Sequence, residues 1–174
     1  MQYHQQSTEE ALRLGCIQQH PLAQKYFYQR YFGQLLGIAM RYTNSREEAT
    51  DVINQAFLKI FNSLDQFRET GSFSGWMAKI VFHTAIDLIR QQKTYRQVMD
   101  FSTEADQVVE SDASEQLDAE DLFRLIQQLP TASRTVFSLY VVDGYKHQEI
   151  ADMLGISEST SKWHLANARQ EMKK

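Results

Sequence analysis

The chain has 174 residues, of which 43% are hydrophobic, and its formal net charge is −4. This composition can build one ordinary core or two small ones, and it excludes a disordered protein. The single cysteine, Cys16, excludes an internal disulfide, and beside Ile17 on an apolar helical face it is predicted to pack rather than react. The first residues lack both the basic start and the apolar core of a leader, and no run of about 18 apolar residues occurs. We therefore expect a cytoplasmic protein without membrane insertion.

The negative charge is unevenly distributed along the chain. Residues 1–98 hold 11 basic and 8 acidic side chains, and residues 122–174 hold 7 and 5. Between them, residues 99–121 hold nine acidic side chains and no basic one. Two mildly basic blocks thus flank an acidic strip, so the low pI does not argue against binding to nucleic acid.

The first 40 residues predict two helices. Ser7 and Glu10 have the Ser-x-x-Glu spacing of a capping box, and the amphipathic helix that follows is expected to end near His20. Pro21 suits the first turn of a long second helix, which runs on to Met40, because its missing N–H would have no partner there. Aromatic residues recur in this helix at spacings of 3 and 4, which favours core packing over base stacking. They are Phe27, Tyr28, Tyr31 and Phe32.

Two more helices are predicted before residue 96. Ser45 and Glu48 form a second capping box, and the helix that they open has a wide apolar stripe. The stripe comprises Val52, Ile53, Ala56, Phe57, Ile60, Phe61 and Leu64. A polar break over residues 66–71 precedes the next helix, which has one apolar face and one polar face. The apolar face comprises Ala78, Phe82, Ala85 and Ile89, and the exposed face Lys79, His83, Asp87 and Arg90.

The helical periodicity fades after Arg96. Residues 97–116 are acidic and contain serines, so they cannot bury themselves cheaply and are predicted to form a linker. The linker would separate a first domain, residues 1–96, from a second, residues 117–174. The predicted fold class is therefore all-α, with two small helical domains joined by an acidic linker.

Two helices are predicted at the start of the second domain. The first contains Leu122, Leu125, Ile126 and Leu129, and Pro130 ends it. The second runs from Thr131 to Val142, with Gly144 after it. Its inward positions are Val136, Phe137 and Tyr140. Lys146 precedes the next helix and is a weaker cap than Ser or Thr, by about 1 kcal/mol.

The chain ends in a predicted helix-turn-helix. The first of its helices has an apolar stripe at Ile150, Ala151 and Leu154 and stops at Gly155, which tolerates left-handed backbone geometry. Ser157 is placed to cap the second helix, with Glu158 at the positive end of the helix dipole. The inward stripe of that helix is Ser161, Leu165, Ala168 and Met172.

The opposite face of the last helix is polar and could meet base edges and phosphates in a major groove. It comprises Ser159, Thr160, Lys162, Trp163, Ala166, Asn167 and Gln170, with His164 at its margin. Arg169, Lys173 and Lys174 are better suited to phosphate, which positions a helix without specifying sequence. Periodicity alone leaves DNA binding open, because every helical hairpin with a glycine turn has a polar side.

The particular residues of this hairpin favour DNA binding over a merely polar surface. The string from Gly144 to Lys162 resembles the promoter-reading helix-turn-helix of extracytoplasmic-function sigma factors in the sigma-70 family, and residues 129–140 resemble the helix before it. Residues 48–57 resemble the family's segment that grips the coiled coil of the largest RNA polymerase subunit. Residues 71–90 resemble the segment that captures an unstacked base of the −10 element. For the acidic linker, the family's path towards the RNA exit channel and a simple solvated tether explain the composition equally well.

The resemblance implies three sets of contacts. For the −35 element it implies Ser159, Thr160, Lys162, Trp163, His164, Asn167 and Arg169. For the −10 element it implies Trp76, Lys79, His83 and Arg90. For the polymerase it implies Asp51, Asn54, Gln55 and Phe57. Phe57 could instead belong to the core, and Trp76 could anchor its loop to the domain.

The chain departs from the family pattern at several of these positions. Asn54 and Gln55 replace a Gln followed by an acidic residue, so one negative contact to a basic partner surface is missing. His83 replaces an Asn, and neutral imidazole offers one donor and one acceptor where an amide pairs bidentately. Trp163 stands where a small Ser is common, and this predicts an unusual promoter preference.

The sequence thus predicts a minimal sigma factor. Its partners would be core RNA polymerase and promoter DNA, and the resemblance also allows for an anti-sigma factor. No enzyme activity, metal or cofactor is expected, because the sequence shows no phosphate loop, metal-ligand cluster or paired nucleophile. One alternative is a helix-turn-helix regulator that acts without core polymerase. It predicts an α/β sensor, whereas residues 1–98 show helical patterns throughout. The other is a helical protein-binding adaptor, which would not support initiation.

Overall fold

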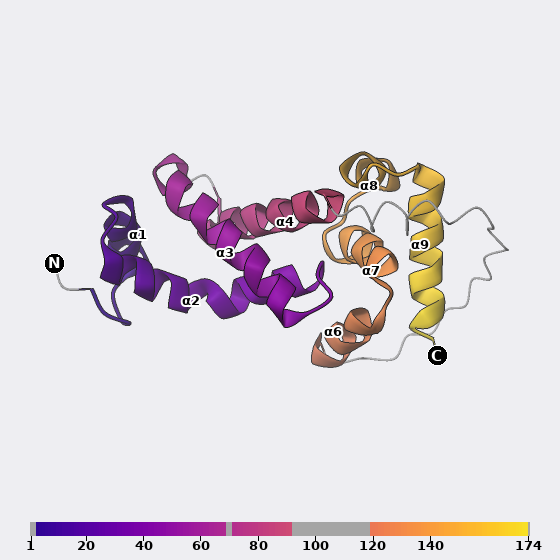
Figure 1. The fold of residues 1–174 in the computed structure, drawn as a ribbon, viewed down its shortest axis with the longest axis horizontal. Coiled ribbons are helices and arrows are strands. Elements are labelled where there is room, and N and C mark those ends of the chain that lie inside the picture. The colour runs from indigo at the N-terminus through magenta and orange to yellow at the C-terminus, as the bar shows by residue number, and fades with distance from the viewer. Residues whose placement is uncertain (1–2, 69–70, 92–118, 174) are drawn as a thin grey trace. The chain divides into compact units, whose positions relative to one another are not determined.

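The computed structural model describes residues 3–68, 71–91 and 119–173, and for residues 119–123 it describes the backbone alone (Figure 1). All regular secondary structure within these ranges is helical, which confirms the predicted all-α class. The chain divides into two compact units, Met1–Ala85 and Ile86–Lys174. This division falls inside a helix, and the predicted linker, residues 97–116, lies outside the described residues. The domain bounds 1–96 and 117–174 therefore stay a prediction.

The described residues up to Gln91 form four α-helices and one short 3-10 helix, and the last of these helices runs past the end of the first unit at Ala85. These are α1 (Glu9–Ile17), α2 (Pro21–Met40), α3 (Arg46–Ser63), η1 (Leu64–Gln66) and α4 (Phe73–Gln91). Helix α2 packs against both α1 and α3, and η1 also packs against α1 and α3. In Figure 1 the long helices α2 and α3 cross at the middle of this unit, and α4 comes next along the chain.

The ends of α1 differ from the prediction. The hydroxyl of Ser7 accepts a hydrogen bond from the His4 backbone N–H at 3.0 Å, so Ser7 belongs to a turn before the helix. Thr8 caps α1 instead and accepts from the Ala11 N–H at 3.2 Å. The helix stops at Ile17 rather than near His20, because Gln19 adopts a left-handed backbone with φ of 56°.

The start of α3 confirms the second capping box, with one shift. The Ser45 hydroxyl accepts from the Glu48 N–H at 3.1 Å, as predicted. The Glu48 carboxylate accepts from the N–H of Asn44 at 2.8 Å, one residue before the cap. Two backbone donors at this helix start are thereby satisfied. Pro21 also occupies the first turn of α2, as predicted.

Phe27 lies at the centre of an aromatic core in the first unit. Its fully buried ring packs against Tyr31, Phe57 and Phe73, with ring centroids 4.8, 6.4 and 5.9 Å away. Core packing is confirmed for Phe27 and Tyr31, whereas Tyr28 and Phe32 are half-buried. Cys16 is also buried, and burial raises the pKa of its thiol to about 12, which confirms a packing role.

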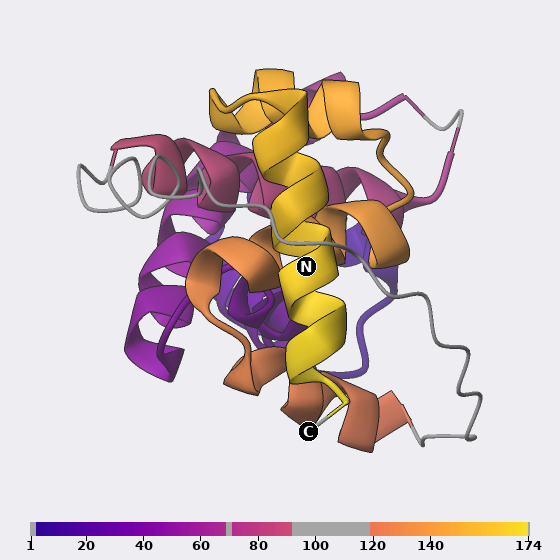
Figure 2. The same ribbon diagram turned by 90° about the vertical axis from the view of Figure 1, so that its right-hand side faces the viewer.

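The second unit contains the predicted helix-turn-helix. From Ala119 on, its described elements are α6 (Ala119–Gln128), α7 (Thr131–Phe137), the π-helical turn η2 (Ser138–Val142), α8 (His147–Leu154) and α9 (Glu158–Glu171). Helix α9 packs against α7 and α8, and Figure 2 shows it as the long yellow helix with α8 at its upper end. Ile126, Leu129 and Val136 are buried, as predicted.

Tyr140 does not point inward as predicted, since its side chain is 37% exposed. The helix that begins at Thr131 widens into π-helical geometry at Ser138, which shifts the register of the residues that follow. The Tyr140 ring consequently stacks on His147, with centroids 4.5 Å apart and 22° between the planes. A regular period of 3.6 residues could not predict this position.

The described residues contain ten helical elements but no membrane span. None of the helices found there is both long and apolar enough to cross a bilayer.

Candidate nucleic-acid and polymerase interfaces

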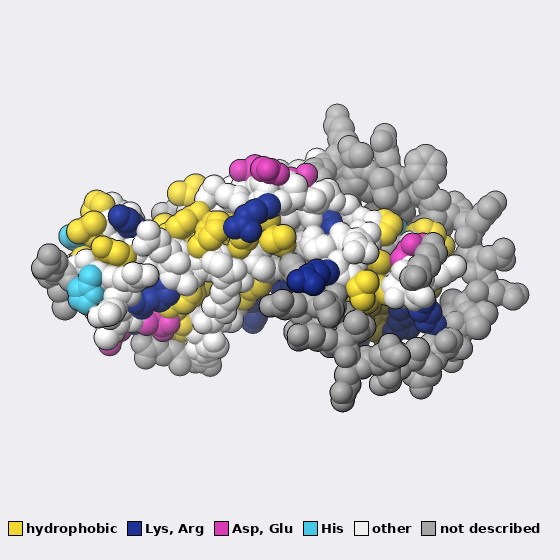
Figure 3. Space-filling model, turned by 90° about the horizontal axis from the view of Figure 1, so that it is seen from below, with side chains coloured by type: hydrophobic (Ala, Val, Ile, Leu, Met, Phe, Trp, Pro, Cys, Tyr) yellow, Lys and Arg dark blue, Asp and Glu magenta, His cyan; other side chains and the backbone are white. Residues whose placement is uncertain are grey.

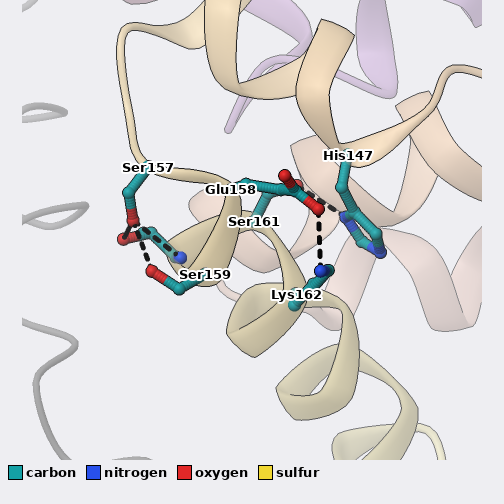
Figure 4. Close-up of polar contacts among 7 residues, drawn as sticks. His147, Ser157, Glu158, Ser159, Ser161 and Lys162 are labelled. Atoms are coloured by element: carbon teal, nitrogen blue, oxygen red, sulfur yellow. Dashed lines mark hydrogen bonds and ion pairs between the residues drawn. The ribbon is translucent and has the colours of Figure 1, made fainter.

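The turn between α8 and α9 has the geometry that the sequence predicts. Gly155 takes a left-handed conformation with φ of 68° and ψ of 38°. Its N–H and that of Ile156 both donate to the Ala151 carbonyl, at 2.9 and 3.1 Å. The Ser157 hydroxyl then caps α9 by accepting from the Thr160 N–H at 3.0 Å (Figure 4). These bonds close one helix and open the next within three residues.

The start of α8 shows how the chain tolerates a lysine at its N-cap. An ammonium group has no acceptor, so the Lys146 side chain cannot cap the helix. The carboxylate of Glu149 instead accepts from the Lys146 backbone N–H at 2.7 Å, which is the reciprocal half of a capping box. The weak cap predicted here is thus partly offset by a residue three positions later.

The buried face of α9 confirms the predicted inward stripe. Ser161, Leu165 and Ala168 are buried, and Met172 near the end of the helix is half-buried. The Ser161 hydroxyl lies 2.9 Å from Nδ1 of His147 on α8, which joins the two helices of the motif (Figure 4). Burial and the nearby Lys162 ammonium lower the pKa of His147.

The opposite face of α9 holds most of the predicted −35 contacts. Ser159, Lys162 and Arg169 are exposed, whereas Thr160, Trp163 and Asn167 are half-buried. The Lys162 ammonium forms an ion pair at 2.7 Å with Glu158, one turn earlier, and this pair lowers the Glu158 pKa (Figure 4). Lys162 therefore already has a carboxylate partner within the motif.

His164 does not belong to this exposed face. Its side chain is only 2% exposed and points towards α7, where Nδ1 lies 3.1 Å from the Ser133 hydroxyl. Burial lowers the pKa of the imidazole to about 4. The prediction that His164 contacts DNA is wrong for this conformation, because a side chain at the margin of the helix turned inward to a polar partner.

The predicted −10 residues lie on α4. Lys79, His83 and Arg90 are exposed, as the helical spacing predicts. Trp76 is half-buried and stacks on Phe73, with centroids 5.8 Å apart and 12° between planes, and it also contacts Phe67. These contacts favour the anchoring role for Trp76 over a purely DNA-facing one.

The predicted polymerase-binding residues lie on α3. Asp51, Asn54 and Gln55 are exposed, and the Tyr28 hydroxyl on α2 donates to the Asn54 side-chain oxygen at 3.0 Å. Phe57 is only 2% exposed and packs on Phe27 and Tyr28, so it is a core residue and not a surface contact. The wide apolar stripe places Phe57 on the buried side of the helix.

Leu58 is an exposed apolar residue that the sequence reading missed. Its side chain is 65% exposed. It follows Asn54 by four residues and Asp51 by seven, so the three lie on one stripe of α3. An apolar residue outside the buried stripe is a signal that the sequence itself contains.

Figure 3 shows Lys and Arg side chains in separate clusters among hydrophobic and uncharged groups on the face that it presents. Among the residues that the structure describes, no group of three or more His, Cys, Asp or Glu side chains could hold a metal ion.

Comparisons with known proteins agree with this geometry. The family model described as Sigma-70 region 2 matches residues 27–95, and the one described as Sigma-70, region 4 matches residues 119–172. The chain belongs to the sigma-70 family. The two matched regions include the exposed faces of α3 and α4 in the first case and the whole helix-turn-helix in the second.

Curated relatives cover almost the whole chain. RNA polymerase sigma factor SigV of Bacillus subtilis is 28% identical over 166 residues, which are 95% of this chain and 92% of the relative. RNA polymerase sigma factor YlaC of the same species is 29% identical over 84% of this chain and 88% of the relative. ECF RNA polymerase sigma-E factor of Haemophilus influenzae is 25% identical over 95% of this chain and 94% of the relative. The predicted resemblance to extracytoplasmic-function sigma factors is thereby confirmed.

Proposed function

We propose that this sigma factor divides promoter recognition between its two helical units. The exposed face of α9 would read the −35 element, and the exposed face of α4 would hold the separated −10 strand. Asp51, Asn54, Gln55 and Leu58 on α3 would bind core RNA polymerase. The protein would act in the cytoplasm by binding alone, and the family resemblance leaves room for an anti-sigma factor as a further partner.

The single observation that carries the proposal is the two-sided character of α9. Its inward stripe is packed against α7 and α8, which leaves Lys162 exposed and Trp163 and Asn167 half-buried on the outer side. A cationic donor, a flat aromatic ring and an amide can meet the donors, acceptors and thymine methyl groups of a major groove. The preceding helix α8 and the tight glycine turn give the spacing in which a second helix enters that groove.

The ion pair between Lys162 and Glu158 affects how the helix would meet DNA. A base or phosphate that takes the Lys162 ammonium has to displace the Glu158 carboxylate, 2.7 Å away. Both groups are well exposed, so the pair is weak and exchange is easy. The Lys162 ammonium therefore remains available to a base or a phosphate despite its carboxylate partner.

The full chain with core RNA polymerase and a promoter library randomised in the −35 element tests the proposal. Lys162→Ala, Trp163→Ala and Asn167→Ala are each expected to relax the preference at one position and to weaken the preferred sequence by about 1–3 kcal/mol. Arg169→Ala should weaken all sequences alike and flatten the salt dependence, because it removes a phosphate contact.

Gln128→Ala is the control, since Gln128 is exposed at the end of α6 and lies outside the helix-turn-helix. Uniform weakening without any change of preference in all three variants would show that α9 does not read the promoter. Failure of the unaltered chain to direct initiation from any promoter would favour the regulator or adaptor alternatives.

A further inference from the structure

A short chain of polar side chains lies beneath the exposed face of α9. The Asn167 side-chain amide donates through Nδ2 to the Ser133 hydroxyl on α7, at 3.0 Å. That hydroxyl lies 3.1 Å from Nδ1 of His164. Ser133 is 1% exposed and His164 2%, whereas Asn167 is half-buried. One predicted base-reading side chain is therefore joined to two side chains that cannot reach DNA themselves.

The orientation of an asparagine amide decides which base it can read. Its carbonyl oxygen accepts and its NH₂ group donates, and a half-turn about the last side-chain bond exchanges the two. An amide that is free to turn presents a donor or an acceptor at the same place, and so it tolerates several bases. Asn167 has one N–H committed to Ser133, which leaves the carbonyl oxygen and the other N–H for DNA. This pair matches the N6 amino group and N7 of adenine in the major groove.

We propose that Ser133 and His164 are positioning residues that hold the Asn167 amide in one orientation and so make it a reader of adenine in the −35 element. This inference rests on the proposed function, because it requires α9 to lie on promoter DNA. Neither residue touches the base, and both act through Asn167.

The role of His164 follows from the single hydrogen of the serine hydroxyl. When Ser133 donates that hydrogen to Nδ1 of a neutral His164, its oxygen can only accept from Asn167, and the reversed amide is excluded. His164 then carries its proton on Nε2. Within the part of the chain that the structure describes, Nε2 is buried without a hydrogen-bond partner. A buried imidazole that leaves one nitrogen unsatisfied is poorly explained by stability alone, and positioning of its neighbour gives it a purpose.

A purely structural role makes a different prediction. If Ser133 and His164 merely satisfied each other between α7 and α9, their replacement would lower stability and leave base preference unchanged. Base preference at one position is therefore the decisive readout, with stability measured alongside.

The experiment uses the full chain with core RNA polymerase and the library randomised in the −35 element. Asn167→Ala first identifies the base position that Asn167 reads, where the unaltered chain should prefer adenine. Ser133→Ala should reduce that adenine preference about tenfold, in the range of one bidentate base contact, and leave the other positions unchanged. Ser133→Thr keeps the hydroxyl and should retain the preference. His164→Phe should broaden the same position, since Ser133 is then free to donate to Asn167.

Ser138→Ala is the matched control. Ser138 is buried in the same unit, and its hydroxyl has no hydrogen-bond partner among the described residues. The same chemical change there should leave the base preference intact. If Ser133→Ala changes only stability, or if Asn167→Ala alters no position, the inference is overturned while the sigma function stands. An unaltered chain that selects no −35 sequence would overturn the proposed function as well.

A second measurement does not depend on the variants folding. Nitrogen-15 NMR of the unaltered chain should show His164 protonated at Nε2 and unprotonated at Nδ1. The opposite tautomer would overturn the positioning role of His164.

Discussion

His83 is the residue on which base preference at the −10 element depends most directly. It is exposed on α4 and stands where the resembling family has Asn. A neutral imidazole offers one donor and one acceptor on opposite sides of a ring, whereas an amide offers both on one edge. We expect His83→Asn to change the preference at one base more than the total affinity, as measured by open-complex formation on a library randomised in the −10 element. His4→Asn, another exposed histidine of the same unit, is the control. An unchanged preference in the His83 variant would remove His83 from the DNA contacts.

His164 makes the stability of the second unit depend on pH. Burial holds its pKa at about 4, against about 6.5 in the unfolded chain. The folded state therefore favours the neutral ring, so stability is complete above pH 6.5 and is lost as the pH falls towards 4. The loss amounts to about 3 kcal/mol at the acid end. Urea unfolding at pH 7 and pH 5 should show this loss of stability, and His164→Gln should show a smaller pH dependence. Equal pH dependence in both chains would contradict this assignment.

His147, whose pKa is also lowered, contributes in the same direction from a more exposed position.

The exposure of single side chains could be predicted from the sequence in some cases and not in others. The exposure of Lys79 and His83 on α4, and of Asp51 on α3, follows from helical spacing and was predicted. The burial of His164 depends on Ser133, which is 31 residues away in the sequence and on another helix. No local pattern encodes such a contact. A side chain at the margin between the apolar and polar faces of a helix can point inward or outward, and a distant partner decides which.

At the scale of the element, the turn between α8 and α9 depends on one glycine. Gly155 has φ of 68°, and a Cβ built there would meet nothing within 4 Å. Any loss on substitution is therefore conformational and not steric. Gly155→Ala should lower the free energy of unfolding of the second unit by about 1–2 kcal/mol, because L-residues are strained in this region. Thermal or urea unfolding measures it.

Gly33→Ala is the control, and it should change the free energy of unfolding in the opposite direction. Gly33 lies inside α2 with open space around it, so alanine should stabilise the helix by about 0.5–1 kcal/mol. A Gly155→Ala chain as stable as the unaltered one would show that the turn adapts without the left-handed conformation.

The helices themselves could be predicted well, and their ends less so. Apolar spacing, Ser45 and Pro21 marked the starts of α3 and α2 correctly, because capping and proline geometry are local. Ser7 and Thr8 can both cap a helix. Because the Ser7 hydroxyl accepts from the His4 N–H in the preceding turn, Thr8 is the residue that caps α1. The π-helical turn at Ser138 has no sequence signature of its own, and Tyr140, which lies in that turn, stacks on His147 instead of pointing inward.

For the whole molecule, the fold class followed from the absence of alternating strand patterns and the recurrence of helical ones. The net charge was less informative, since −4 conceals two basic blocks and an acidic strip. Helical spacing placed Asp51, Asn54 and Gln55 on the outside of α3. It also placed Phe57 within the apolar stripe, and the resemblance alone drew Phe57 into the contact set. For Phe57, helical spacing predicted the observed burial and the family resemblance did not.

Assembly with the polymerase gives the test at this largest scale. Asp51→Arg and Gln55→Arg place cations on the proposed α3 face, where a basic partner surface would repel them. Each should weaken binding to core RNA polymerase at least tenfold, or about 1.4 kcal/mol, in a titration at moderate salt. Leu58→Ser should also weaken binding, but with little dependence on salt, because it removes apolar contact and no charge. Asp65→Arg makes the same reversal of charge as Asp51→Arg at an exposed position on η1 and should bind normally. Full affinity in both arginine variants of α3 would place the polymerase contact on another face of the first unit.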